Sequence, residues 1–266
     1  MSKFIAAMDH SGGSTGGVLE RYGQEYTEED KMDKVHAMRL RMVNSPDFNS
    51  DNIWGAILYK DSIDRGLHNV LATKGIMVFL KIDSGCNPDG TLKQFPLKQM
   101  ISYANRHAVG AFGTKMRSIV KSVNMVNTVL EQQFVIASNI IKAGLMPIIE
   151  PEVPIDSEDK QEIEEALCLQ LKHELDKYDG KCILKLTPPE QPNLYYDLIN
   201  HPNVSRIVFL SGGYSTNEAC NKLGLNDEVT ASFSRALSQD LFYNLTDEDF
   251  NATISRNIEM ITKAST

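Results

Sequence analysis

Residues 146–186 read MPIIEPEVPIDSEDKQEIEEALCLQLKHELDKYDGKCILKL, and this stretch decides the fold class. Two short apolar runs, Met146–Ile149 and Cys182–Leu186, enclose a longer segment of mixed polarity. Within that segment Ser157 and the acidic residues after it suit a helix N-terminus, and isoleucine and leucine residues recur along one stripe up to Tyr178. Short apolar runs between turn residues are typical of buried parallel strands. The stretch therefore predicts a strand–helix–strand unit.

The same alternation continues along the whole chain. The other predicted strands are Phe4–Met8, Trp54–Tyr59, Met77–Ile82, Ala108–Met116, Ile207–Leu210 and Val229–Phe233. The other predicted helices are Thr27–Met42, Leu97–His107, Ser118–Ala143 and Asp247–Lys263. Eight strands alternating with helices fit either a closed barrel or an open doubly wound sheet, and a chain of 266 residues matches the usual barrel size. No linker or break in composition interrupts it. We predict an α/β protein with one domain, residues 1–266, folded as a single (β/α)8 TIM barrel.

Composition and charge exclude several classes of protein. A net charge of −8 disfavours a nucleic-acid partner, because such proteins usually carry a basic stripe. No apolar run approaches the roughly 18 residues that a membrane span needs, and the N-terminus lacks the apolar core of a signal peptide. The four cysteines are scattered, which favours reduced structural thiols. We expect a cytoplasmic protein without nucleic-acid or membrane partners.

Charged and hydroxyl side chains occur at the C-terminal end of several predicted strands. Residues two apart in a strand share a face. The faces that run from apolar or small to polar are Ile5, Ala7 and Asp9; Phe79, Lys81 and Asp83; Gly113, Lys115 and Arg117; Ile148, Glu150 and Glu152; Ile183, Lys185 and Thr187; and Ile207, Phe209 and Ser211. Any single charge of this kind is more often a satisfied ion pair. Six strands with the same gradient predict a charged cluster at the barrel mouth, where active sites of this fold lie.

A cluster of lysines and carboxylates at such a mouth suits one kind of chemistry. A lysine held among other cations and away from water loses its proton more easily. The neutral amine can form an iminium with a carbonyl substrate, and a nearby carboxyl group such as Glu150 can move the protons that this requires. Metal-assisted chemistry is the rival, but the six histidines show neither HxH nor HExxH spacing. We therefore predict no metal site and no cofactor.

Two glycine-rich segments predict phosphate binding. Ser11–Gly17 follows the first predicted strand, and Ser211–Ser215 follows the seventh. Backbone N–H groups in such loops, at the start of a helix, form an anion site. Either loop alone is a weak signal, but phosphate sites in barrels favour the loops after strands 7 and 8, and Arg235 follows the eighth strand. Two phosphate sites beside a lysine–carboxylate cluster indicate a bisphosphorylated carbonyl compound.

Seven segments, in order along nearly the whole chain, resemble class I fructose-1,6-bisphosphate aldolase, and are most similar to its short bacterial form. They are FIAAMDHSGGST (Phe4–Thr15), FLKIDSG (Phe79–Gly85), TKMRS (Thr114–Ser118), PIIEPEV (Pro147–Val153), ILKLTPP (Ile183–Pro189), FLSGGYS (Phe209–Ser215) and SFSRAL (Ser232–Leu237). The resemblance implies a lyase of glycolysis and gluconeogenesis. Such an enzyme cleaves fructose 1,6-bisphosphate reversibly to dihydroxyacetone phosphate and glyceraldehyde 3-phosphate.

The resemblance also implies catalytic roles, residue by residue. Lys185 matches the Schiff-base lysine that attacks C2 of the substrate. Glu150 matches the acid and base that dehydrates the carbinolamine and takes the C4 hydroxyl proton, and Glu152 matches the neighbour that tunes the lysines. Asp9 matches the aspartate that orients the iminium. Lys115 matches the lysine that stabilises developing negative charge.

The positions that the resemblance assigns to substrate binding are Lys81, Arg117, Ser11, Ser14, Ser211, Gly212 and Arg235. Lys81 would contact substrate hydroxyls, and Arg117, joined by Arg21, would hold the C6 phosphate. Ser211, Gly212 and Arg235 would bind the C1 phosphate. Ser11 and Ser14 would contribute at the other end of the substrate.

Three points stay open at this stage. The sequence ends at Thr266, so we expect no C-terminal tail with the tyrosine that assists proton exchange in animal-type enzymes, which leaves Glu150 or a water to protonate the enamine. His10 stands where the family has Glu or Gln.

The alternative functions are another Schiff-base sugar-phosphate lyase or transaldolase, and a non-catalytic barrel. The expected partners are small-molecule sugar phosphates, with homo-oligomerisation left open.

Overall fold

Eight parallel strands form the centre of the molecule. The computed structural model describes residues 3–12 and 14–266, with the side chain of Ser14 outside the description. The strands are β1 (Phe4–Met8), β2 (Ile53–Leu58), β3 (Met77–Lys81), β4 (Gly113–Ile119), β5 (Met146–Glu152), β6 (Cys182–Leu186), β7 (Val204–Phe209) and β8 (Thr230–Ala231). Each strand pairs in parallel with the next one along the chain. The N–H group of Ala7 donates to the carbonyl of Phe233 at 3.0 Å, which links β1 to the segment after β8.

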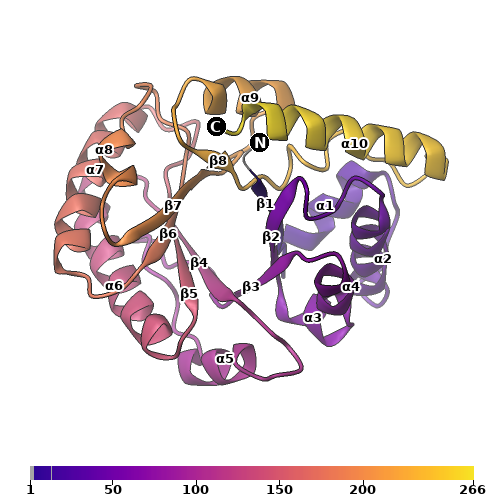
Figure 1. Ribbon diagram of the computed structural model, residues 1–266, viewed down its shortest axis with the longest axis horizontal. Helices are drawn as coiled ribbons and strands as arrows, with labels where there is room; N and C mark the ends of the chain where they lie inside the picture. Colours follow the sequence, from indigo (N-terminus) through magenta and orange to yellow (C-terminus); the bar gives the residue numbers. More distant parts are fainter. Residues whose placement is uncertain (1–2, 13) are drawn as a thin grey trace.

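Helices surround this ring of strands (Figure 1). They are α1 (Ser14–Tyr22), α2 (Lys31–Asn44), α3 (Lys60–Asp64), α4 (Leu67–Thr73), α5 (Leu97–Ala104), α6 (Val123–Lys142), α7 (Lys160–Lys177), α8 (Tyr196–Ile199), α9 (Thr216–Gly224) and α10 (Asp247–Ala264). The arrangement is the predicted (β/α)8 barrel. No helix in the described ranges is both long and apolar enough to cross a membrane.

The strands bury both of their faces, in two separate apolar layers. The inner layer fills the barrel with Ile5, Ala7, Ile57, Phe79, Ile148, Ile183 and Val208. The outer layer lies between the strands and the helices and includes alternate residues of the same strands, such as Ala6, Ile149 and Leu184. The interior is therefore packed below the mouth, so that only the C-terminal ends of the strands offer space for polar groups.

Several predicted element boundaries are wrong, and the two largest errors concern β4 and the helix after it. The helix predicted from Ser118 begins at Val123, because Ser118 and Ile119 continue β4 and pair with Pro151 and Glu152 of β5. The spacing of four residues from Ile119 to Val123 fits a helix stripe, but barrel pairing overrides that local pattern. The strand predicted from Ala108 begins only at Gly113, and the residues before it form a turn.

The predicted inner face of the seventh strand is also wrong. Ile207 and Phe209 pack in the outer layer, whereas Val208 lies inside the barrel. The strand ends at Phe209, so Ser211 belongs to the following loop and does not continue the alternation. All three strand residues are apolar, and their pattern therefore carried no information about which face each one occupies.

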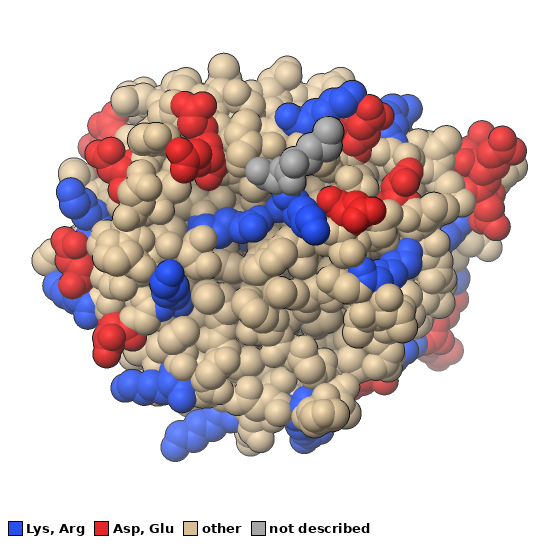
Figure 2. Space-filling view, in the orientation of Figure 1, with Lys and Arg blue, Asp and Glu red and all other residues tan. Residues whose placement is uncertain are grey.

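Charged side chains of both signs are interspersed on the surface. On the face of the described chain seen in Figure 2, Lys and Arg lie along the lower edge and just above the middle, and Asp and Glu lie mainly at the upper left and on the right. This face has no continuous basic stripe, in keeping with the acidic net charge of −8.

Candidate active site

A cavity of about 380 Å³ opens at the C-terminal ends of the strands. Its volume lies within the range of small-molecule sites. The residues that line it are Ala7, Asp9, His10, Ser11, Gly17, Arg21, Lys81, Lys115, Arg117, Glu150, Glu152, Lys185, Leu210, Ser211, Gly212, Ser232, Ser234 and Arg235. Eleven of the twelve predicted site residues are among them, and the twelfth is Ser14, whose side chain lies outside the described structure.

Four charged groups form one buried chain of contacts at the centre of the cavity. Lys115 on β4 lies 2.5 Å from Oδ2 of Asp9 and 2.9 Å from Oε2 of Glu150. The other oxygen of Glu150, Oε1, lies 3.0 Å from Nζ of Lys185. Lys115, Glu150 and Lys185 are each no more than 3% exposed. They come from the adjacent strands β4, β5 and β6. The alternation of side chains along each strand places all three inside the barrel.

These contacts determine the protonation of the carboxylates. Burial alone would raise the pKa of Asp9, but the ammonium groups of Lys115 and Lys185 outweigh it and hold that pKa well below its ordinary value. Burial opposes ionisation of Glu150 too, and the same two lysines again lower its pKa. Burial would lower the pKa of Lys115, whereas Asp9 and Glu150 raise it. Asp9 and Glu150 are therefore carboxylates at neutral pH, and Lys115 is an ammonium ion.

A second group of charges lies at the rim of the same strands. Nε and Nη2 of Arg117 donate to the two carboxylate oxygens of Glu152, at 2.5 and 2.8 Å. Nζ of Lys81 donates to Oγ of Ser11 at 2.9 Å and lies 3.3 Å from Oδ1 of Asp83. The fork of Arg117 is thus engaged by Glu152, and Lys81 is the strand lysine that reaches the first glycine-rich loop.

The loop after β7 is a tight turn next to the side chain of Arg235. Gly212 has φ +57°, and a Cβ at this position would lie 2.5 Å from a methyl carbon of Ile155, so the turn requires glycine. The N–H groups of Gly213 and Tyr214 fold back onto the carbonyl of Ser211, at 2.6 and 2.8 Å. Two of the backbone donors expected to bind an anion are therefore used within the turn. Nη1 of Arg235 lies 3.4 Å from the place where a Gly213 Cβ would be.

Two predicted positions lie in unexpected surroundings. Arg21, expected beside Arg117, has Arg235 as the neighbouring charge that most affects it: burial lowers the pKa of Arg21, and Arg235 lowers it further. Thr187 is outside the cavity lining, because its Oγ1 bonds both the N–H and the carbonyl of Val153 at 3.0 and 2.7 Å. Thr187 thus joins the ends of β5 and β6.

Three polar lining residues were not predicted as site residues: His10, Ser232 and Ser234. Ser232 and Ser234 are two residues apart, directly after β8. Polar residues with the same spacing end the other strands, and that pattern would have indicated both serines. His10 directly follows Asp9, but a histidine outside any ligand spacing gives no signal of its own in the sequence.

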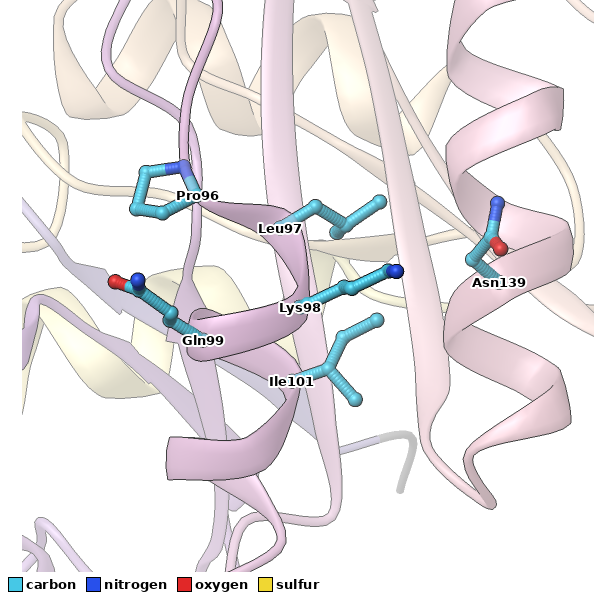
Figure 3. Close-up of a pocket in the computed structure, with 6 residues that line it drawn as sticks. All are labelled: Pro96, Leu97, Lys98, Gln99, Ile101 and Asn139. Atoms are coloured by element: carbon cyan, nitrogen blue, oxygen red, sulfur yellow. The ribbon is translucent and has the colours of Figure 1, made fainter.

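A second hollow lies on the outside of the barrel and differs in chemistry. It encloses about 590 Å³ and is lined by Pro96, Leu97, Lys98, Gln99, Ile101 and Asn139. Leu97, Lys98 and Ile101 project from α5 toward α6, where Asn139 lies (Figure 3). Its lining has one amine and no carboxylate, so it lacks the acid–base pair of the barrel mouth. Within residues 3–12 and 14–266, no three His, Cys, Asp or Glu side chains are grouped to hold a metal ion.

Comparison with known proteins gives a likeness of fold. No protein-family model matches the chain. A fructose-bisphosphate aldolase from Plasmodium falciparum, in a ternary complex with TRAP and a small-molecule inhibitor, has 19% sequence identity and a TM-score of 0.75 over 98% of this chain and 90% of its own. An archaeal fructose 1,6-bisphosphate aldolase has 12% identity and a TM-score of 0.59 over 98% and 94%.

A further solved structure, of an archaeal fructose-1,6-bisphosphate aldolase with its catalytic lysine covalently bound to the carbinolamine intermediate of the substrate, has 11% identity and a TM-score of 0.57 over 98% of this chain and 94% of its own. Identities this low establish a common fold and leave the reaction open. Over nearly its whole length, the chain is similar in fold to fructose-bisphosphate aldolases.

Proposed function

We propose that the protein is a class I, Schiff-base aldolase that reversibly cleaves fructose 1,6-bisphosphate to dihydroxyacetone phosphate and glyceraldehyde 3-phosphate. The observation that carries the proposal is the buried pair of Lys185 and Glu150, 3.0 Å apart at the barrel mouth. An amine and a carboxylate at hydrogen-bond distance are the two groups that iminium chemistry needs.

The first half of the reaction uses that pair directly. Glu150 takes a proton from the ammonium of Lys185, which leaves a neutral amine to attack the C2 carbonyl. The proton on Glu150 then goes to the C2 hydroxyl of the carbinolamine, and water leaves as the iminium forms. Lys115, 2.9 Å from the other oxygen of Glu150, keeps the carboxylate oriented through these transfers.

The second half breaks the bond between C3 and C4. Glu150, ionised again, accepts the C4 hydroxyl proton, and the electron pair of the breaking bond moves into the iminium to give an enamine. In this scheme Asp9, which forms an ion pair of 2.5 Å with Lys115, orients the iminium. Protonation at C3 and hydrolysis then release dihydroxyacetone phosphate.

Cations in two parts of the cavity favour a substrate with two phosphates. Arg235 lies beside Gly213 in the turn after β7, with Arg21 as a neighbouring charge, and Lys81 comes from β3 at the other part of the cavity. A transaldolase or a lyase acting on a monophosphate needs one anion site only. The arrangement therefore favours fructose 1,6-bisphosphate, with small sugar phosphates as the partners of a glycolytic enzyme.

We expect the purified protein to cleave fructose 1,6-bisphosphate in the presence of EDTA, because every group in the scheme is a side chain. The two triose phosphates should appear in equal amounts, measured by coupled dehydrogenase assays. Activity that EDTA abolishes, or cleavage of fructose 6-phosphate at the same kcat/KM, would count against the proposal.

Replacing Arg235 by alanine is expected to raise KM for fructose 1,6-bisphosphate roughly tenfold to hundredfold, since charge-assisted hydrogen bonds contribute about 1.5–3 kcal/mol. The KM for fructose, which has no phosphate, should change little. Steady-state kinetics with both ketoses measures this difference. An equal rise for both would show that Arg235 shapes the cavity without binding phosphate.

A further inference from the structure

Ile155 packs against the glycine turn that follows β7. A Cβ built on Gly212 would lie 2.5 Å from Cγ2 of Ile155, and one built on Gly213 would lie 3.3 Å from its Cδ1. The two methyl groups of Ile155 therefore occupy the space beside both glycines. Ile155 belongs to the loop after β5, so a loop from one strand supports the turn at the end of another.

The residues on both sides of Ile155 determine its position. Val153 is buried, and its N–H donates to Oγ1 of Thr187 at 3.0 Å while its carbonyl accepts from the same oxygen at 2.7 Å. Pro154 follows, and a residue that precedes proline is restricted to extended conformations. The N–H of Ser157 donates to the carbonyl of Pro154 at 3.2 Å, which closes a turn with Ile155 at its second position. The side chain of Ile155 is therefore a fixed surface for the turn after β7.

The turn that Ile155 contacts carries groups that suit a phosphate. The N–H groups of Gly213 and Tyr214 are used within the turn, whereas the N–H of Gly212 has no acceptor within residues 3–12 and 14–266. Nη1 of Arg235 lies 3.4 Å from the place where a Gly213 Cβ would be, on the glycine that Cδ1 of Ile155 also approaches. A backbone donor and a guanidinium group beside each other are the pair of groups that binds phosphate oxygens.

We propose that Ile155 is a positioning residue for phosphate binding, whose branched side chain holds the turn after β7 so that the Gly212 N–H and the Arg235 guanidinium bind one phosphate. Two successive glycines, with φ of +57° and +125°, give a turn that can adopt many conformations unless a neighbour packs against it. Ile155 restricts both glycines, because each of its methyl groups contacts one of them. The inference rests on the proposed function for the phosphate at this turn and does not depend on the chemistry of Lys185.

The first test shortens Ile155, with Ile101→Ala as the matched control. Ile101 is also partly buried, but it lies on α5, outside the cavity. Calorimetry with inorganic phosphate at pH 7 should show affinity weakened about tenfold for Ile155→Ala and less than about twofold for I101A, because a misplaced hydrogen bond to an anion loses much of its strength. Ile155→Val keeps Cγ2 against Gly212 and should weaken binding about threefold or less. Wild-type affinity in folded I155A would overturn the proposal.

A double-mutant cycle with Gly212 separates positioning from a general loss of stability. In the wild type, Gly212→Ala places a Cβ against Cγ2 of Ile155, and phosphate binding should weaken at least about tenfold. In I155A that methyl group is gone, and the same substitution should cost at least about fivefold less. The strain of alanine at positive φ is present in both backgrounds and cancels in the comparison. Losses that simply multiply would show that Ile155 and the turn act independently, and the proposal would fall.

Two further measurements distinguish this proposal from the aldolase assignment. Borohydride trapping of dihydroxyacetone, which carries no phosphate, should reach the same extent in I155A and in the wild type. If I155A loses trapping together with phosphate affinity, Ile155 supports the whole site and the proposal fails. If the wild type traps no ketone while I155A still weakens phosphate binding, the aldolase assignment fails and the role of Ile155 stands. Arg235→Ala should remove the phosphate binding that calorimetry detects, and binding that survives this change would place the phosphate elsewhere and overturn the proposal.

Discussion

Replacing Lys185 by methionine is expected to reduce turnover of fructose 1,6-bisphosphate by a factor on the order of 10⁶, the scale on which loss of a covalent nucleophile acts. Methionine has a similar length and no amine, so the iminium cannot form. The fold should persist, because Glu150 keeps its contact with Lys115 at 2.9 Å. Steady-state assays and thermal unfolding of the purified variant measure both effects.

Lys181→Met is the matched control for this change. Lys181 is exposed and directly precedes β6, the strand that carries Lys185. The same substitution there removes an ammonium group outside the cavity, and activity should stay within about twofold of the wild type, as surface substitutions usually have small effects. If K185M retained turnover while folded, the proposed chemistry would be untenable.

Replacing Glu150 by glutamine is expected to lower kcat by about 10²–10⁴, the usual contribution of a general acid or base. Glutamine keeps the shape of the side chain but cannot take the proton from Lys185 or from the C4 hydroxyl. The change should appear mainly in kcat, because the phosphate-binding side chains are untouched. Rapid-quench measurements of iminium formation and of cleavage should both be slower.

This variant is also expected to be less stable. Removing one partner of a buried ion pair costs about 3–5 kcal/mol, and Glu150 serves two buried lysines. Thermal unfolding must therefore accompany the kinetics. Glu158→Gln, at an exposed position in the loop after β5, is the control. A folded E150Q with the kcat of the wild type would remove Glu150 from the mechanism.

The sequence predicted the barrel and the central cluster because the relevant patterns are local. Each strand–helix unit repeats the pattern seen in residues 146–186, and a parallel barrel is the arrangement that buries eight such units in order. The alternation of side chains along each strand predicted that Lys115, Glu150 and Lys185 lie on the inner face of the barrel. The pairing of Ile148 and Ile149 with Ile183 and Leu184 brings Glu150 level with Lys185. Lys115 pairs with Ile148, two residues before Glu150, and its long side chain reaches the carboxylate.

Other features depend on contacts that one strand or loop does not encode. In Ile207–Phe209 every residue is apolar, so alternation could not show that Val208 points inward. Arg21 lies at the end of α1, and only the packing of that helix decides that it approaches Arg235. His10 gains its environment from Arg39 and Ser234, which are remote in sequence.

Borohydride trapping is the most direct test of the claim that Lys185 becomes covalently joined to the substrate. The protein is incubated with dihydroxyacetone phosphate, reduced and digested, and the modified peptide is identified by mass spectrometry. The account predicts one adduct on Lys185, formed in K181M and missing from K185M. An adduct on another lysine of the cavity, or unmodified protein that still cleaves fructose 1,6-bisphosphate, would contradict it.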